Sequence, residues 1–438
     1  MYLERIFSEE KKRIIINFFL ALIPLTLILG NLTINLNILI IIFLSGIFYF
    51  NRINFDNLSY VEKATIAFFS FILLTGLWNQ IIIYTTENDF NDYHVIITKS
   101  FFLLRFLVLI FIVKFLVEEK LFNFKWFFLS SLFCVTFVCI NIIYQFYFSK
   151  DIFGIAPMHP RKLSGPFGDE LIAGGYIQRF SIFAFFSLSL FLKIRKPYLS
   201  LAFTALFLLT FISIILSGNR MPLILFALLI FLVLIFEKAV RKYIFPIFLI
   251  TSIIFGSTYY FNKQVKINFD HFTRSTGKMI NVFMTDIGKK EKIFKEADIP
   301  LYYQEFRSFY ETWKMNKFIG GGVKSFRENC KRREIKNDYE RVECNTHPHN
   351  YYLEIMSEIG LIGFFLVIFM FFSVVRSSFK QNYQGGAYSN KVFIAILFVF
   401  IAEIIPVRSS GSFFTTGNAT FIFLMYAILL GSIKKILK

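Results

Sequence analysis

The sequence contains little of what a water-soluble enzyme uses. Only 17% of its residues are charged, whereas 56% are hydrophobic, and phenylalanine occurs 62 times in 438 residues. A water-soluble globule does not need so much apolar surface, so the composition predicts an all-α polytopic membrane protein. The nucleotide-sugar motif Asp-x-Asp, the dinucleotide fingerprint and the Walker phosphate-loop spacing are absent, and the glycine-rich stretch Gly320–Lys324 is interpreted as a turn.

Cleavage signals and cysteines are also scarce. The first apolar run follows Glu9–Arg13 and no small-residue cleavage site comes after it, so we expect no cleavable signal peptide. Cys134 and Cys139 lie in an apolar run and are interpreted as small hydrophobic residues. Cys330 and Cys344 flank a charged segment. They are candidates for a disulfide if that segment lies outside the cytoplasm, and would be free thiols inside it.

Twelve apolar segments come near the ~20 residues that a membrane-crossing helix needs. The boundary between the first two, at Gly30-Asn31, is the least defined. Nine spans fall in residues 1–261 and three in 349–438, which leaves 262–348 as one long polar loop. The twelve segments are 14–31, 32–50, 64–84, 100–117, 125–148, 171–192, 197–216, 219–236, 243–261, 349–375, 391–405 and 412–433.

Lysine and arginine concentrate in alternate short connections, on the same side as the N-terminus. The positive-inside rule places this side in the cytoplasm, and an even number of spans returns the C-terminus there. The loop 262–348 then faces the periplasm. The net charge of +18 indicates contact with membrane lipids or diphosphates and not with nucleic acid.

Within the long loop, aromatic residues recur every three or four positions. This spacing predicts an amphipathic helix that lies on the membrane or caps the helix bundle. The residues are Tyr302, Tyr303, Phe306, Phe309, Tyr310 and Trp313.

A polar segment meets an apolar one at Thr346–Phe364. A helix that begins at Pro348 would place His349, Gly360 and Gly363 on one face, because the glycines follow by eleven and fourteen residues. Two glycines on one face let a neighbouring helix approach closely. A histidine at a helix N-terminus stays neutral, as a general base beside a phosphate must. The alternative is an ordinary transmembrane helix with a histidine at its mouth.

Arginines at or near the outer ends of spans are candidate anion ligands. Arg161 and Arg220 lie in outer connections, and Arg179 lies inside a span. The planar guanidinium suits diphosphate oxygens, and intramembrane charges often mark functional sites. Arg220 could instead contact lipid headgroups, and Arg179 could instead form an ion pair with Glu403 or Glu358.

Four elements, in this order, resemble the O-antigen ligase family, which belongs to the ligase and polymerase superfamily of bacterial surface polysaccharide assembly. They span about residues 160–375. The elements are Leu163–Asp169; Ser217–Arg220; Arg307 with Trp313 and Gly320–Gly322; and His349-Asn350 followed, nine residues later, by Gly360–Gly363.

The resemblance implies a GT-C-like, metal-independent glycosyltransferase of the bacterial inner membrane, without cofactor, whose site opens to the periplasm. The donor would be a glycan on undecaprenyl diphosphate, in agreement with the missing nucleotide-sugar motif. Arg220 and Arg307 match arginines that hold the diphosphate, and Arg161 and Arg179 match less closely. His349 matches the histidine that activates the acceptor hydroxyl, and a single displacement would invert the anomeric centre.

Side chains around His349 leave further alternatives open. His347 and His349 form a possible metal pair, but no spacing matches a known zinc site, so we expect no metal. His347, Glu354 and Glu358 are candidates for binding acceptor hydroxyls. The two glutamates could equally pair with arginines of the bundle.

Several functions compete. A ligase would transfer the glycan to lipid A-core, whereas a polymerase would extend a growing glycan on its lipid carrier. An oligosaccharyltransferase acting on protein is a further superfamily member. A glycolipid transporter or flippase would also have many spans, but the long loop and the lack of evident inverted halves disfavour it.

Overall fold

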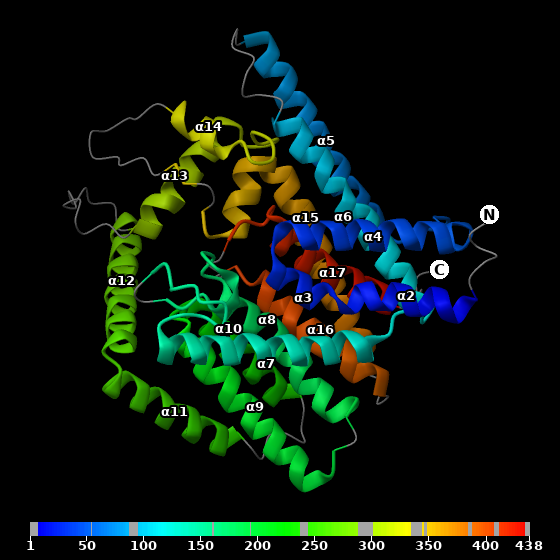
Figure 1. Ribbon diagram of the computed structural model, residues 1–438. Helices are drawn as coiled ribbons and strands as arrows, with labels where there is room; N and C mark the ends of the chain where they lie inside the picture. The colour runs from blue at the N-terminus through cyan, green and yellow to red at the C-terminus, as the bar shows by residue number, and fades with distance from the viewer. Residues whose placement is uncertain are drawn as a thin grey trace.

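The computed structural model describes residues 8–433 except 54, 87–94, 160–161, 193, 237–243, 288–300, 334–343, 346–347, 384–387 and 407–410. Within these residues the structure is helical, with one isolated bridge between His159 and Lys162 and no strand (Figure 1). Seven helical stretches of the described chain are long and apolar enough to cross a membrane, and three further apolar helices are shorter. The protein is therefore a polytopic membrane protein.

Each apolar segment found in the sequence coincides with helical structure. The first segment covers most of α2 (Glu9–Ala21) and all of α3 (Ile23–Leu29). The others are, in order, α4 (Asn31–Tyr49), α5 (Tyr60–Thr86), α6 (Val95–Glu118), α7 (Phe124–Phe148), α8 (Ala173–Leu190), α9 (Lys196–Leu216), α10 (Arg220–Phe236), α11 (Ile244–Phe261), α15 (Tyr351–Tyr383), α16 (Tyr388–Ile404) and α17 (Thr416–Ser432). Short 3-10 turns, η1 (Phe50–Arg52) and η2 (Gly165–Phe167), follow α4 and precede α8.

The turn between α3 and α4 lies where the sequence left the boundary least defined. Gly30 has φ 99°, a conformation that glycine adopts without the steric cost of a β-carbon. Thr33 then donates a hydrogen bond to the Gly30 carbonyl oxygen at 2.8 Å. The chain therefore reverses at Gly30, and α4 begins with the next residue.

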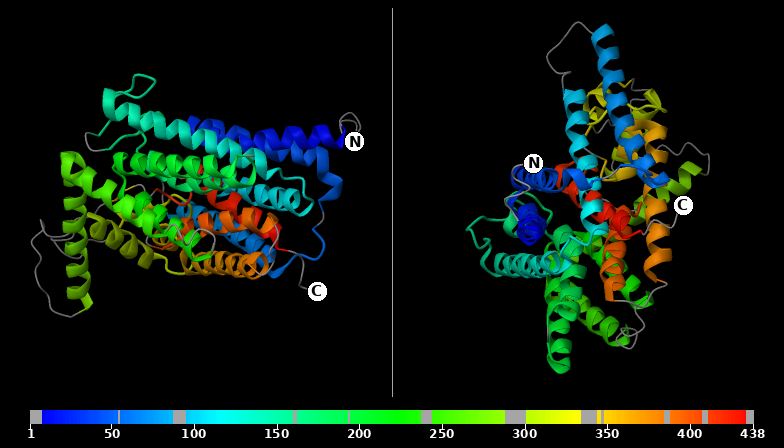
Figure 2. Two further views of the ribbon diagram at one scale, coloured as in Figure 1. Left: turned by 90° about the horizontal axis from the view of Figure 1, so that it is seen from below. Right: turned by 90° about the vertical axis from the view of Figure 1, so that its right-hand side faces the viewer.

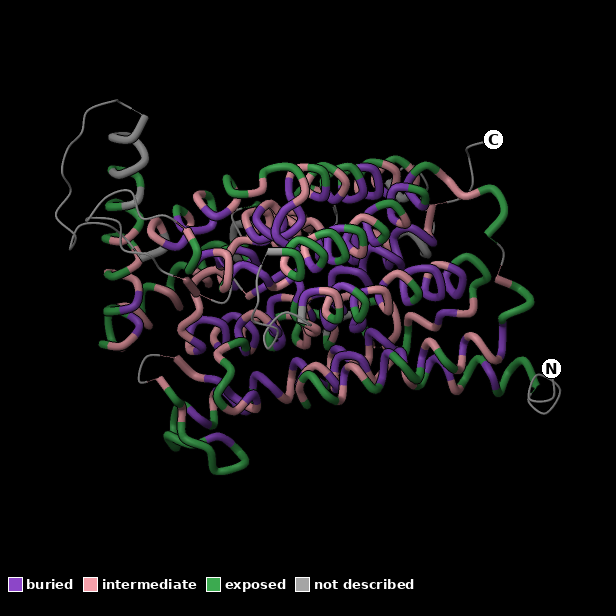
Figure 3. Tube along the Cα trace, turned by 90° about the horizontal axis from the view of Figure 1, so that it is seen from above, coloured by how far each residue is buried: buried purple, intermediate pink, exposed green. Residues whose placement is uncertain are grey.

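α17 forms the centre of the bundle, and its residues Ala419–Gly431 are buried on every side. Figure 3 shows buried residues gathered inside the bundle and exposed residues along its outer helices. A helix that is apolar all round is expected in such a position. α6 packs so closely against α17 that a β-carbon on Gly431 would lie 2.6 Å from the Lys114 carbonyl oxygen.

Three helices of the long loop lie on the side of the molecule opposite the start of α2 and the end of α17 (Figures 1 and 2). They are α12 (Lys263–Ile287), α13 (Leu301–Met315) and α14 (Phe326–Lys331). α13 covers the amphipathic helix that the sequence predicted. The sequence analysis did not predict α12, which runs across the direction of α4 and α7 (Figure 1).

A small separate core holds α13 and α14 together. Phe309 and Phe326 stack with their ring planes 8° apart, and both are buried. A disulfide joins Cys330 to Cys344, with the Cα atoms 5.7 Å apart. Leu353 of α15 packs against this core, so the long loop is attached to the start of α15.

We expect Gly431→Ala to destabilise the protein by about 1–3 kcal/mol, because the new β-carbon would push α17 away from the α6 backbone. Thermal unfolding of the detergent-solubilised protein measures this. Gly256→Ala in α11 is the matched control, because its β-carbon would meet nothing within 4 Å. Alanine is otherwise the better helix former, so equal stability of the two variants would disprove the close packing.

Candidate functional site

His349 lies just before α15 in a backbone conformation that few residues adopt. Its φ is 53°, in the left-handed region, which costs a residue with a β-carbon about 1–3 kcal/mol unless its surroundings compensate. The sequence predicted that the helix begins at Pro348, but α15 begins at Tyr351. His349 is therefore outside the helix, two residues before its first turn.

Asn350 fixes this turn. Its side-chain oxygen accepts hydrogen bonds from the backbone N–H groups of Tyr352 and Leu353, at 3.0 and 3.1 Å, and so caps α15. Its side-chain nitrogen donates to the Pro406 carbonyl oxygen at 2.8 Å. The residue after His349 thus connects the start of α15 to the chain that follows α16.

Two effects disfavour the charged form of His349. Burial lowers the pKa of its imidazole below the ordinary value of 6.5, and the positive charge of Lys162 lowers it further. Lys162 belongs to the connection between α7 and α8 and is half-buried, as is His349. A neutral imidazole has a nitrogen free of protons, so His349 is equipped to accept one from a hydroxyl group.

The helix α15 is interrupted at Gly360, beyond His349 in the chain. Gly360 has φ 66° and ψ −173°, which no helix contains. The segment before α14 crosses α15 at this break. Leu361 donates its backbone N–H to the Lys317 carbonyl oxygen at 2.9 Å, and Gly322 donates to the Glu358 carbonyl oxygen at 2.7 Å.

The close approach predicted at Gly360 is therefore made by a loop and not by a neighbouring helix. A β-carbon on Gly360 would lie 2.1 Å from the Phe318 carbonyl oxygen. At Gly363 a β-carbon would instead meet Ile359 of α15 itself. The prediction of one continuous helical face through His349, Gly360 and Gly363 was wrong, because the backbone changes direction at Gly360.

The glycine-rich turn presents Lys324 to a buried carboxylate. Lys324 has φ 64°, and its ammonium group lies 3.4 Å from Oε1 of Glu354, which has no exposed surface. Ser412 donates to the same oxygen and accepts a hydrogen bond from Lys324. The backbone N–H of Phe413 donates to Oε2 at 2.6 Å. Glu354 thus holds three segments together: the start of α15, the glycine-rich turn and the loop before α17.

Glu358, one turn further along α15, is also buried and is 1% exposed. Its Oε2 has no hydrogen-bond partner among the described residues. The sequence offered both glutamates as acceptor ligands or as partners of arginines. The structure gives Glu354 a lysine as its partner, and it gives neither carboxylate an open surface.

Arg179 forms the internal ion pair that the sequence offered as its alternative. It donates to both carboxylate oxygens of Glu403, at 3.0 and 2.5 Å, and to the side-chain oxygen of Asn418 at 2.6 Å. Tyr351 donates its hydroxyl to Glu403 at 3.2 Å. Together with Tyr351 and Asn418, the pair therefore connects α8, α15, α16 and α17.

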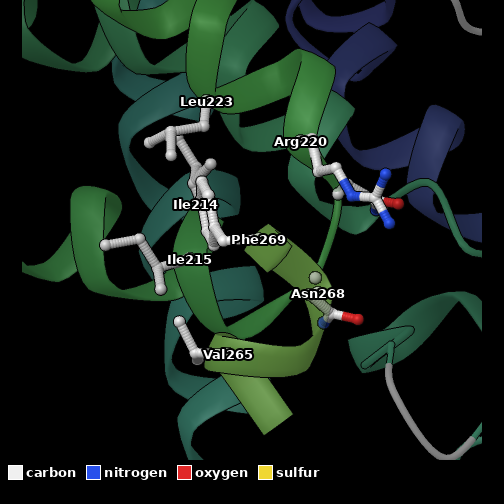
Figure 4. Close-up of a pocket in the computed structure, with 9 residues that line it drawn as sticks. Ile214, Ile215, Arg220, Leu223, Val265, Asn268 and Phe269 are labelled. Carbon is white, nitrogen blue, oxygen red and sulfur yellow. The ribbon is translucent and has the colours of Figure 1, made fainter. Parts of the chain in front are cut away.

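Arg220 begins α10 at the rim of a pocket. Its guanidinium points away from the apolar side chains of the pocket (Figure 4) and lies 5.5 Å from the centre of the Phe272 ring of α12. The preceding residue, Asn219, donates to the Leu171 carbonyl oxygen at 3.0 Å. The pocket is lined by Ile214, Ile215, Gly218, Asn219, Arg220, Leu223, Val265, Asn268 and Phe269.

The structure says less about the three remaining predicted site residues. Arg307 lies on the exposed face of α13. Arg161 and His347 lie outside the described residues. Within the part of the chain that is described, no three His, Cys, Asp or Glu side chains gather as metal ligands would.

The sequence analysis did not identify two lysines as site residues. Lys162 follows Arg161, which was singled out instead, and Lys324 was interpreted as part of a flexible turn. The signal that could have identified Lys324 is the run of three glycines before it, since such a run lets a backbone lie against another element. Lys162 carries no such signal.

We expect Lys324→Met to destabilise the protein by about 2 kcal/mol or more, because it leaves Glu354 as a buried charge without its cation. Adding Glu354→Gln should restore part of the loss. Thermal unfolding in detergent is the measurement, and Lys317→Met removes an exposed lysine as the control. If Lys324→Met and Lys317→Met unfold at the same temperature, the ion pair does not stabilise the protein.

Comparison with known proteins finds a match for the part of the chain that includes Arg220 and His349. Residues 205–368 match the family model described as O-Antigen ligase. No curated protein matches the chain. The matched segment contains Arg220, the helices α12 to α14, the glycine-rich turn and His349, whereas the element at Leu163–Asp169 lies before it. Over residues 205–368, this chain is therefore similar to the O-antigen ligase family.

Proposed function

We propose that this protein is a glycosyltransferase that moves a polysaccharide from undecaprenyl diphosphate to a lipid A-core acceptor on the periplasmic face of the inner membrane. The observation that carries the proposal is His349, which has a left-handed backbone conformation within the family-matched segment and whose pKa is lowered by burial and by Lys162. Ligase activity is the form that we favour. A polymerase of the same superfamily would use the same donor chemistry with a growing glycan as acceptor.

The proposed reaction needs a base and a place for negative charge. His349 would take the proton from the acceptor hydroxyl as its oxygen attacks C1 of the donor sugar. The bond from C1 to the diphosphate would break on the opposite face, so the product would have inverted configuration. The diphosphate leaves with its electron pair, and fixed cations stabilise this charge best in a site of low dielectric. No metal is required for this chemistry.

Arg220 is the cation that we assign to the diphosphate. Its charged group is directed away from the apolar side chains of the pocket, which is too small for a lipid chain, so the guanidinium itself is the proposed contact for the diphosphate. Arg307 remains a second proposed ligand on α13. We assign Arg179 a positioning role instead, because Glu403 and Asn418 already occupy its guanidinium.

The proposed orientation follows the distribution of basic residues. Twelve spans in a GT-C-like arrangement would leave both termini in the cytoplasm, and the start of α2 and the end of α17 do lie on the same side of the molecule (Figure 2). Helices α12 to α14 lie opposite and would face the periplasm. This orientation would bring donor and acceptor to the side where His349 precedes α15 and Arg220 begins α10.

Deletion of the gene in its bacterium tests the proposal and separates it from the polymerase. Loss of a ligase should leave long glycan chains on the undecaprenyl carrier and none on lipid A-core. Loss of a polymerase should leave single repeat units attached to the core. Unchanged surface glycans and unchanged carrier-linked glycans would exclude both activities and would favour other classes such as a transporter.

His349→Ala should abolish glycan transfer, by at least about the 100-fold that general-base catalysis contributes, without removing the protein from the membrane. Full activity in this variant would refute the role of His349.

The pH dependence of transfer is a second measurement. Activity should fall only below the lowered pKa of His349, because the protonated imidazole cannot accept a proton. Lys162→Gln should move this fall to higher pH, and Lys150→Gln, an exposed lysine of the same connection, should not.

A further inference from the structure

Where α11 meets α12, exposed aromatic residues end α11 and an exposed lysine begins α12. α11 is a peripheral apolar helix, and Phe248 and Ile253 on its surface are 69% and 58% exposed. At its end, Tyr260 and Phe261 are 80% and 83% exposed. In a membrane protein such surfaces face lipid, and aromatic rings at a helix end belong to the interface with water. α12 begins after Asn262, directly at this level.

α12 turns across the bundle at that level and buries one face. Val265 and Asn268 are 5% and 8% exposed, and Phe269 lies with them against α9 and α10 (Figure 4). Phe272, on the same face, lies beneath the guanidinium of Arg220. The apolar face of α12 is thus fixed to the start of α10.

The other face of α12 is basic. Lys263, Lys266 and Arg274 are exposed, and so is Lys278. Asp270, the acidic residue among the described side chains of α12, accepts a hydrogen bond from Tyr259 at 2.6 Å. Because the apolar face of α12 is packed against the protein, the face that remains for an anionic bilayer is the cationic one, which starts beside the interfacial aromatic residues of α11 and would bind headgroups by charge.

We propose that α12 is an interfacial helix that binds anionic phospholipid headgroups through Lys263, Lys266 and Arg274. The position of α12 supports a bilayer surface as the partner, because the helix runs across the bundle axis and directly continues the lipid-exposed α11 (Figures 1 and 2). Each cation near an anionic surface strengthens binding severalfold, and the attraction extends about 10 Å at moderate salt. Headgroup binding would hold α12, and with it Phe272, against Arg220.

The test compares lipid binding by the purified full-length protein and by the variant Lys263→Gln/Lys266→Gln/Arg274→Gln. Native mass spectrometry from detergent micelles that contain phosphatidylglycerol and phosphatidylcholine counts the lipids that remain bound. The wild type should prefer phosphatidylglycerol, and the variant should lose about tenfold or more of that preference. Rising salt should weaken the preference of the wild type and leave the variant unchanged.

Lys314→Gln/Lys317→Gln/Lys331→Gln is the matched control, because it removes the same charge from exposed positions after α12. This control should keep the wild-type preference. Size-exclusion chromatography verifies that each variant is folded, and Arg274→Lys, which keeps the charge, should bind as the wild type does. Three results would overturn the proposal: no preference in the wild type, an equal loss in the control, or selective binding of purified lipopolysaccharide but not of phosphatidylglycerol.

Discussion

The break in α15 at Gly360 is the constraint on which the candidate site depends. A continuous helix would satisfy its own backbone groups and leave no carbonyl for the loop before α14. Because Gly360 adopts φ 66°, the N–H of Leu361 and the carbonyl of Glu358 pair with that loop instead. This segment before α14 then places Lys324 against Glu354. It thereby attaches the region between α11 and α15 to α15, the helix that follows His349.

Two buried ion pairs also hold elements of the bundle together. The Lys324–Glu354 pair connects α15 to the glycine-rich turn, and the Arg179–Glu403 pair connects α8 to α16. Charges within a membrane are costly unless they are paired, so each pair strongly disfavours any arrangement that separates its members. His349 therefore lies at the end of a rigid element, while its own ring stays half-buried near Lys162. A proposed base has to be held in this way, because a proton transfer requires hydrogen-bond distance.

The proposed site and the proposed lipid-binding helix are neighbours. α12 contributes Phe272 to the contact of Arg220, and its cationic residues lie on its other face. A transferase with a lipid-linked donor has to receive that donor sideways from the membrane. If α12 is fixed at the headgroup level beside Arg220, it would keep the entrance for the lipid-linked donor at a constant depth in the membrane.

The sequence by itself determined the class of the protein and most of its helices, because twelve apolar runs near the bilayer length leave few alternatives to membrane-spanning helices. It also pointed to the O-antigen ligase family, whose model matches residues 205–368, through His349-Asn350, Ser217–Arg220 and their order in the chain. Its error at Gly360 arose because helical spacing was extended through a glycine, and periodicity does not reveal a break that tertiary contacts stabilise. Only the tertiary structure decided that Arg179 pairs with Glu403, that Lys324 pairs with Glu354 and that Lys162 acts on His349. The residues of these pairs are 30 to 224 positions apart, and which distant charges meet depends on how helices pack and not on local spacing.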